Sequence, residues 1–237
     1  MWSKIASILL RYRFAVLIAL GCATIFMGTY IPQLRLVYEF GGFLPEDDST
    51  FIEYEKFLEH FGAEGNLLVL GVEDSNIYEA EGLQAWYELA DDIRHVRVVV
   101  NGVETEIIDS VFSVAQAFTL EKDTSDATFR VVPIASDLTR GGPALSQKRV
   151  DEIYAQVLEL PFYSGVLFSN KSDATLMMVF IEPVLFNSEN RGSVIEDITA
   201  LADKWSEKTG MKVYMSGLPF VRIQMTNKVK GEIGWFI

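Results

Sequence analysis

The sequence contains very few of the residues on which most enzyme and metal sites depend. Among 237 residues there is one cysteine, Cys22, and there are two histidines, His60 and His95. A single cysteine excludes an internal disulfide and a cysteine-rich metal site. The sequence motifs of phosphate-binding loops, dinucleotide-binding folds, serine hydrolases and zinc proteases are also missing. We therefore expect no enzyme activity, no catalytic residues, no cofactor and no metal, and the sequence leaves the substrate-binding residues unknown.

Positive charge is also scarce. The formal net charge is −13, and every Asp and Glu except Glu232 lies between residues 33 and 230. Such an acidic segment repels the phosphates of nucleic acids, which excludes DNA and RNA as partners. Hydrophobic residues nevertheless make up 49% of the chain. The two facts together predict that apolar residues are concentrated in a few segments.

The clearest apolar segment is Phe14–Ile31, which contains no charged side chain. At a helical rise of about 1.5 Å per residue, its length matches a hydrocarbon core of about 30 Å. Lys4, Arg11 and Arg13 precede it, and positive charge on this side favours a cytoplasmic N-terminus. Residues 1–32 are therefore predicted to form a cytoplasmic tail and a transmembrane helix.

Three other interpretations of this segment are a cleaved signal peptide, a lipoprotein signal ending at Cys22, and a buried helix of a soluble domain. A signal peptide has a shorter apolar core followed by small residues, whereas Ile25, Phe26 and Met27 continue the apolar run. A lipoprotein has a polar tether after its cysteine, which this chain lacks. These differences favour a retained transmembrane helix.

A second apolar segment begins at the C-terminal end of the chain. Lys228–Glu232 is followed by Ile233–Ile237, which includes the aromatic pair Trp235-Phe236. Aromatic residues after a charged stretch are typical of the entry into a membrane span. Residues 231–237 are predicted to start a second, truncated span, and an ordinary apolar tail is the alternative.

Residues 33–230, between these segments, are predicted to form an α+β domain outside the cytoplasm. Its main elements are two strand–helix–strand units. The predicted ranges are strand 66–72, helix 79–95, strand 107–114, strand 174–181, helix 189–209 and strand 212–216. Two such units side by side predict a ferredoxin-like (βαβ-βαβ) sandwich with helices on one face of the sheet.

The remaining segments are predicted to be insertions and connections. Asn101-Gly102 predicts a hairpin turn, and residues 119–142 are polar enough to cross the surface as a loop. Further predictions are a helix over 147–158 and a hairpin that pairs 166–168 with 174–181 around a turn at 169–173. The glycosylation sequon Asn170–Ser172 falls in that turn, and we interpret these residues as ones that favour the turn.

Acidic residues precede a short amphipathic helix that is predicted to end at Gly62. The cluster Glu46–Asp48, with Ser49, can cap this helix and interact favourably with its dipole. A cation site is the alternative, but the cluster has no EF-hand pattern. Capping is the favoured interpretation.

The few chemically distinctive residues have simple structural interpretations. His60 and His95 lie near the ends of predicted helices, as surface or capping residues do. Asp91-Asp92 are adjacent on a helix and are expected to point in different directions. We interpret Gly141-Gly142 as part of a loop, and Met177-Met178 as core residues of a strand.

The order of these features resembles the RND superfamily, and within it the MMPL-type branch of predicted exporters. The most specific motif is Phe43–Asp48 after the first span, followed by an aromatic-rich helix that ends Phe61-Gly62. Asp109–Val111 with Ser113, the hairpin Leu167–Thr175, and Ser216–Pro219 before a second span complete the resemblance. It extends over essentially the whole chain.

This resemblance implies the N-terminal part of a proton-driven exporter of lipids or other hydrophobic molecules. The domain would be a periplasmic porter-type domain on the substrate path, in a multi-pass protein of the cell inner membrane. Its expected partners are the lipid bilayer, a hydrophobic or lipid substrate, the rest of the transporter chain, and a homo-oligomer or periplasmic partner. The proton-relay residues would lie beyond Ile237. The alternative is a single-span, membrane-anchored binding or scaffold protein whose acidic domain docks a partner.

Overall fold

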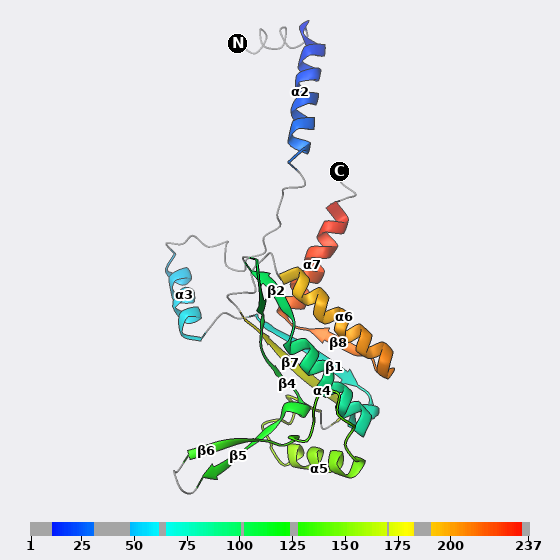
Figure 1. The fold of residues 1–237 in the computed structure, drawn as a ribbon. Helices are drawn as coiled ribbons and strands as arrows, with labels where there is room; N and C mark the ends of the chain where they lie inside the picture. Colours follow the sequence, from blue (N-terminus) through cyan, green and yellow to red (C-terminus); the bar gives the residue numbers. More distant parts are fainter. Residues whose placement is uncertain are drawn as a thin grey trace. The chain divides into compact units, whose positions relative to one another are not determined.

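A computed structural model of the chain describes residues 11–30, 48–61, 65–100, 102–123, 128–169, 171–182 and 191–233. The chain is an α+β protein (Figure 1). It divides into two compact units, Met1–Glu39 and Phe40–Ile237, and each unit is described by itself. Most of the Phe43–Asp48 motif, Gly62, Asn101 and Asn170 lie outside the described residues.

The first unit contains the helix α2, Arg13–Gly28. Its apolar side chains are exposed along its whole length, including Phe14, Ile25 and Met27. Within the ranges that the structure describes, no helix has both the length and the apolar composition needed to cross a membrane.

The second unit is built on a four-stranded antiparallel sheet. Its strands are β1 (Leu67–Glu73), β4 (Ile108–Phe112), β7 (Ala174–Ile181) and β8 (Val213–Ser216). Their order across the sheet is β4-β7-β1-β8, and every neighbouring pair is antiparallel. Between β1 and β4 the chain forms one α-helix and a hairpin, and between β7 and β8 it forms one α-helix. Across the sheet, β7 separates β1 from β4, and β1 separates β7 from β8. The two predicted strand–helix–strand units are therefore interleaved in a single sheet.

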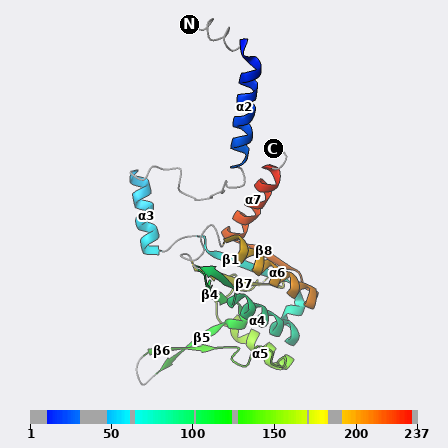
Figure 2. The ribbon, with the colours of Figure 1, turned by 45° about the horizontal axis from the view of Figure 1, so that its top comes forward.

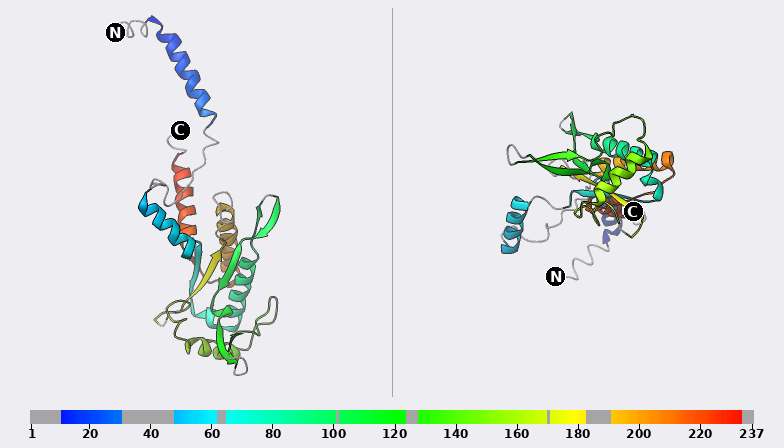
Figure 3. Two further views of the ribbon diagram at one scale, coloured as in Figure 1. Left: turned by 90° about the vertical axis from the view of Figure 1, so that its left-hand side faces the viewer. Right: turned by 90° about the horizontal axis from the view of Figure 1, so that it is seen from below.

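The helices α4 (Ala80–Arg94) and α6 (Arg191–Thr209) lie side by side on the same side of the sheet (Figures 1 and 3). They bury the alternate strand residues Leu68, Leu70 and Val72 of β1, together with Met177 and Val179 of β7. Because strand side chains alternate between faces, the other residues of these strands point to the opposite side. We call this the second face of the sheet; its apolar members are Leu67, Val69, Phe112, Ala174, Leu176, Met178, Phe180 and Tyr214.

A second apolar core lies around α5, Gln147–Leu158, whose bounds agree with the predicted helix. Its side chains come from α4, α5, the residues that follow β4, residues 134–138, and the turn before β7. At its centre the hydroxyl of buried Tyr163 donates to the carbonyl oxygen of Phe118 at 2.7 Å and accepts from Phe118 N at 3.1 Å. This pair of hydrogen bonds fixes the start of β5.

Two hairpins extend from these cores. The first pairs β2 (Arg97–Val100) with β3 (Val103–Glu106), and Gly102 has φ +80°, as the predicted hairpin turn requires. The second pairs β5 (Phe118–Asp123) with β6 (Thr128–Pro133) and projects from the second core (Figure 2).

The second hairpin corrects the prediction that residues 119–142 form a surface loop. Beyond it, Ile134, Ala135 and Leu138 are buried in the second core. The prediction was wrong because the hairpin exposes its apolar residues, such as Phe129 at 67%, among polar neighbours. The segment therefore has the composition of a loop.

The predicted hairpin that pairs 166–168 with 174–181 is confirmed only in part. Phe168 forms a bridge with Thr175, and on either side of it Leu176 N donates to Leu167 O at 2.7 Å and Ser169 N donates to Ala174 O at 2.9 Å. Residues 166–168 do not form a continuous strand, because the chain turns where they begin: Leu167 N donates to Tyr163 O at 2.9 Å, and Gly165 has φ +75°.

The helix α3, Ser49–Phe61, begins where capping predicts. Asp48 Oδ1 accepts a 2.8 Å hydrogen bond from Thr50 N, and this backbone hydrogen bond lowers the pKa of Asp48. The side chains of Tyr54 and Phe57 on its apolar face are 38% and 41% exposed.

The helix α7, Leu218–Ile233, follows β8 directly. Gly217 precedes it with φ +116°, and a Cβ at this position would collide with the carbonyl oxygen of Leu67. Gly231 lies inside α7, so the helix runs across the boundary predicted between 230 and 231. Gly210, with φ +76°, ends α6 as predicted.

Candidate functional site

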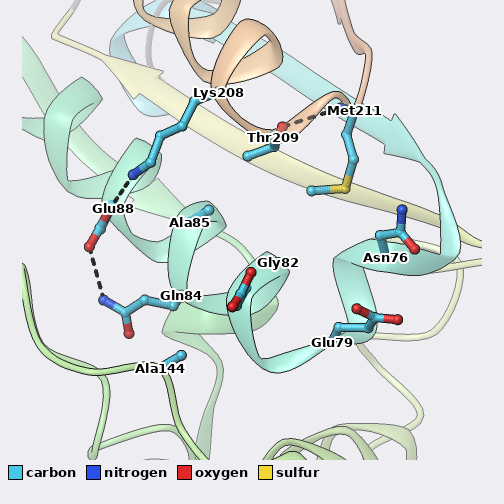
Figure 4. Close-up of a pocket in the computed structure, with 11 residues that line it drawn as sticks. Asn76, Glu79, Gly82, Gln84, Ala85, Glu88, Ala144, Lys208, Thr209 and Met211 are labelled. Atoms are coloured by element: carbon cyan, nitrogen blue, oxygen red, sulfur yellow. Dashed lines mark hydrogen bonds and ion pairs between the residues drawn. The ribbon is translucent and has the colours of Figure 1, made fainter.

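The first cavity of the second unit lies where the start of α4 meets the end of α6 (Figure 4). It has a volume of about 470 Å³. Its lining is mostly polar and includes three carboxylates. The lining residues are Asn76, Glu79, Glu81, Gly82, Gln84, Ala85, Glu88, Ala144, Lys208, Thr209 and Met211.

A chain of polar contacts crosses this cavity. Lys208 Nζ lies 3.3 Å from Glu88 Oε2, and Gln84 Nε2 donates to Glu88 Oε1 at 3.2 Å (Figure 4). The same Gln84 nitrogen donates to the carbonyl oxygen of Thr139 at 2.9 Å. The contacts tie α6, α4 and the loop around Thr139 together.

These contacts also affect the ionisation of Glu88. The hydrogen bond from Gln84 lowers the pKa of Glu88, assisted by Lys208, and outweighs the opposing effect of burial. Glu79 and Glu81 lie at the start of α4, where negative charge interacts favourably with the helix dipole. A carboxylate that stays ionised near neutral pH does not act as a general acid there. The cavity therefore has the chemistry of a structural contact between helices.

Asp91 and Asp92 differ from the sequence-based expectation. They were expected to point in different directions, but both reach the guanidinium of Arg140. Arg140 Nη1 lies 2.6 Å from Asp91 Oδ2, and Nη2 contacts Asp92 Oδ1. Adjacent helical residues can converge in this way because one guanidinium presents several donors in a fork. This fork holds the loop of Arg140 against α4.

The two histidines have the structural roles that their positions predicted. His95 is the residue that follows α4, and its Nδ1 lies 2.7 Å from the carbonyl oxygen of Asp91. His60 lies in the last turn of α3, with Nδ1 2.8 Å from the carbonyl oxygen of Lys56. Each ring is thus engaged by a backbone carbonyl one turn earlier in its helix.

The other residues singled out from the sequence also lie where their simple interpretations place them. Met177 is fully buried and Met178 is half-buried against the second core. Gly141, with φ +67°, lies in a turn. Ser169 Oγ accepts from the backbone N–H groups of Lys171 and Ser172 at 3.1 and 3.2 Å, which is turn chemistry. Cys22 is an exposed residue of α2.

Within the described ranges, no group of three or more His, Cys, Asp or Glu side chains is arranged to hold a metal ion.

A second cavity, of about 570 Å³, lies beside α5. It has an aromatic and aliphatic wall and a charged rim. The lining residues are Tyr78, Asp151, Tyr154, Val157, Leu158, Phe168, Ser169, Lys171, Ser172 and Asp173. The volume is in the range of small-molecule sites, about 300–1,000 Å³.

Sequence reasoning missed this second cavity because its residues come from distant parts of the chain. Tyr78 precedes α4 in the 3-10 helix η2 (Ser75–Tyr78), and Tyr154 lies in α5. The only available signal was the helical spacing of Tyr154 between Val150 and Val157. That spacing predicts that Tyr154 lies beside the buried face of its helix, but it does not predict the contact with Tyr78.

Comparison with known proteins does not assign the chain to a family. No protein-family model matches this chain, and no curated protein matches its sequence.

Proposed function

We propose that this chain supplies the first membrane segment and the first porter-type domain of a proton-driven exporter of lipids or other hydrophobic molecules, of the RND type. In this proposal residues 33–230 form a ferredoxin-like domain outside the cytoplasm, and residues 231–237 start a second membrane span. The domain contacts further segments of the transporter and the substrate path. It does not itself couple transport to protons.

The observation that carries this proposal is the apolar second face of the interleaved sheet. Met178 packs there against the second core of the same chain. Leu67, Val69 and Leu176 are half-buried, and Phe180 and Tyr214 are 39% and 55% exposed. Antiparallel sheets that face water on one side normally alternate apolar and polar residues. An apolar second face is instead typical of a sheet that packs on another protein layer. A porter-type domain within a larger transporter would have such a layer.

The composition of α2 supports a membrane location. Its residues are apolar on every side, and their side chains are exposed. A helix that is hydrophobic all round belongs in a protein core or in a membrane. Phe14–Ile31 contains no Asp, Glu, Lys, Arg or His, the residues from which proton relays within membranes are built. Any proton coupling must therefore come from other spans of the parent protein.

Export by the parent protein, measured with substitutions at Phe180 and at a control position, tests this proposal. Phe180→Asp places a charge on the second face of the sheet and should reduce proton-driven export by about tenfold or more, because an unpaired charge is costly at a packed interface. Val99→Asp is the matched control, since Val99 is an exposed apolar strand residue of the β2–β3 hairpin. Thermal unfolding of both variants should stay close to that of the wild type. Equal export by the two variants would contradict the proposal.

The second candidate is a membrane-anchored binding or scaffold protein, and the β5–β6 hairpin favours it. The paired residues Leu120 and Val131 share one face of the hairpin with Phe129, and all three are more than half exposed. An isolated two-stranded hairpin is marginally stable in water, so an apolar face of this kind is typical of a contact surface. Loss of partner binding in Phe129→Ser, with unchanged export by the parent protein, would favour the scaffold function.

A further inference from the structure

The second cavity combines an aromatic pair, two carboxylates and an apolar wall. The rings of Tyr78 and Tyr154 meet edge to face, with centroids 4.7 Å apart and an interplanar angle of 64°. The Tyr154 hydroxyl donates to the carbonyl oxygen of Ile77 at 3.2 Å, which fixes that ring. Burial raises the pKa of both phenols. Both rings therefore remain neutral and keep the negative electrostatic potential of their faces.

Asp151 is held at this cavity by a defined set of hydrogen bonds. Gln147 Nε2 donates to Asp151 Oδ1 at 2.9 Å and to the carbonyl oxygen of Tyr78 at 3.1 Å. The Gln147 Oε1 atom accepts from Ala80 N at 3.0 Å. Gln147 thus joins α5 to the segment that carries Tyr78, and it positions the Asp151 carboxylate at the rim.

Asp173 provides the second carboxylate. Burial is the main cause of the raised pKa of Tyr78, and the negative charge of Asp173 is the second cause. The Asp173 carboxylate therefore interacts electrostatically with the Tyr78 side chain. Among the described residues, no Lys, Arg or His lies within ion-pair distance of Asp173. Lys171 also lines the cavity and is the one cation among the described residues of its lining. Two carboxylates and one ammonium leave the lining with an excess of negative charge.

We propose that this cavity binds an organic cation with an apolar body, such as a quaternary ammonium that carries an aromatic or alkyl group. The cationic centre lies against the faces of Tyr78 and Tyr154, as ammonium groups do in aromatic sites. Asp151 and Asp173 balance its charge, and the apolar body packs on the aliphatic and aromatic wall. That wall is formed by Val157, Leu158 and Phe168.

The charge of the whole protein favours the same ligand class. A net charge of −13 attracts cations and repels anions before contact. The inference goes beyond the proposed export function, because it depends only on the geometry of this cavity. It holds equally for a transporter domain and for an anchored binding protein.

Calorimetric titration of the full chain in zwitterionic lipid nanodiscs tests the proposal. The probe is benzyltrimethylammonium, and its uncharged isostere, neopentylbenzene, is the matched ligand control; empty nanodiscs give the lipid background. We expect saturable binding of the cation and at least tenfold weaker binding of the isostere. Tyr78→Leu should weaken binding of the cation by about 2- to 30-fold, the range of cation–π interactions.

Charge variants give effects of opposite sign, which a general loss of folding would not produce. Asp173→Asn should weaken binding of the cation, and Lys171→Gln should strengthen it. Asp109→Asn, an exposed residue of β4 outside the cavity lining, should leave affinity unchanged. Equal affinity for the two probes, no saturable binding, or the same effect of Asp173→Asn and Asp109→Asn would overturn the proposal.

Discussion

Trp86 and Trp205 meet edge to face between α4 and α6, with ring centroids 5.3 Å apart. The two indoles differ in their hydrogen bonding. Trp205 Nε1 donates to the carbonyl oxygen of Ala85 at 2.8 Å. Trp86 Nε1 is buried and has no hydrogen-bond partner among the described residues. One ring therefore joins the helices by packing and a hydrogen bond, and the other by packing alone.

This difference predicts unequal costs for two similar substitutions. Trp205→Phe and Trp86→Phe remove similar volumes, but only the first also removes a hydrogen bond. The free energy of unfolding should therefore fall by about 1 kcal/mol more in Trp205→Phe than in Trp86→Phe. Chemical denaturation measures both variants. An equal or larger loss in Trp86→Phe would show that the hydrogen bond to Ala85 does not contribute.

Gly210 predicts a purely conformational effect, since no heavy atom lies within 4 Å of a Cβ built there and its φ is +76°. Gly210→Ala should lower the free energy of unfolding by about 1 kcal/mol, the cost of left-handed geometry for a residue with a Cβ. Gly192→Ala is the matched control inside α6, where a Cβ also meets open space. It should raise stability by about 0.5–1 kcal/mol. A loss of stability in Gly192→Ala would contradict this explanation.

The ionisation of Glu88 predicts a pH dependence of stability. Its pKa in the folded state is lowered from a reference value of 4.5, mainly by Gln84. A lowered pKa contributes stability that is fully present above the unfolded pKa and is lost as the pH falls through the folded pKa. Glu88→Gln should therefore lower the melting temperature at pH 7 and have a smaller effect at pH 3. A pH-independent difference between the two proteins would contradict this linkage.

The individual strands and helices around the sheet could be predicted from the sequence because their signals are local. The interleaved order β4-β7-β1-β8 depends on strand pairings between distant segments. The apolar spacing of α4, the alternating burial of β1 and β7, and the glycine after α6 each depend on neighbouring residues. Gly210 shows this most directly, since its left-handed φ was expected from the end of a periodic segment. Local periodicity is the strongest signal in a single sequence.

The features that could not be predicted depend on contacts between distant segments. Arg140 is 48 residues from Asp92, with which it pairs. Tyr78 meets Tyr154 only because η2 and α5 pack together. The β5–β6 hairpin was missed for a different reason: its strands are not buried on either side, so Phe129 is exposed in a polar context.

The membrane topology is a separate prediction. A phosphatase fused after Gly141, in the exposed turn beyond the second hairpin, should be active outside the cytoplasm, and a fluorescent protein fused there should be dark. The reason is the positive charge of Lys4, Arg11 and Arg13 before the apolar segment. Mass spectrometry of the mature N-terminus is the control. A mature chain that begins at Cys22 or shortly after it would contradict a retained helix.

The most direct test of the account is proton-driven flux across liposomes. The purified chain Met1–Ile237 and the longer transporter that the proposed function implies are reconstituted separately, and transport of a lipid or hydrophobic dye is followed after a proton gradient is imposed. The account predicts gradient-dependent flux for the longer transporter and none for Met1–Ile237, because Phe14–Ile31 contains no Asp, Glu, Lys, Arg or His to relay protons. Gradient-driven flux by Met1–Ile237 that an uncoupler abolishes, or no such flux by the longer transporter, would contradict it.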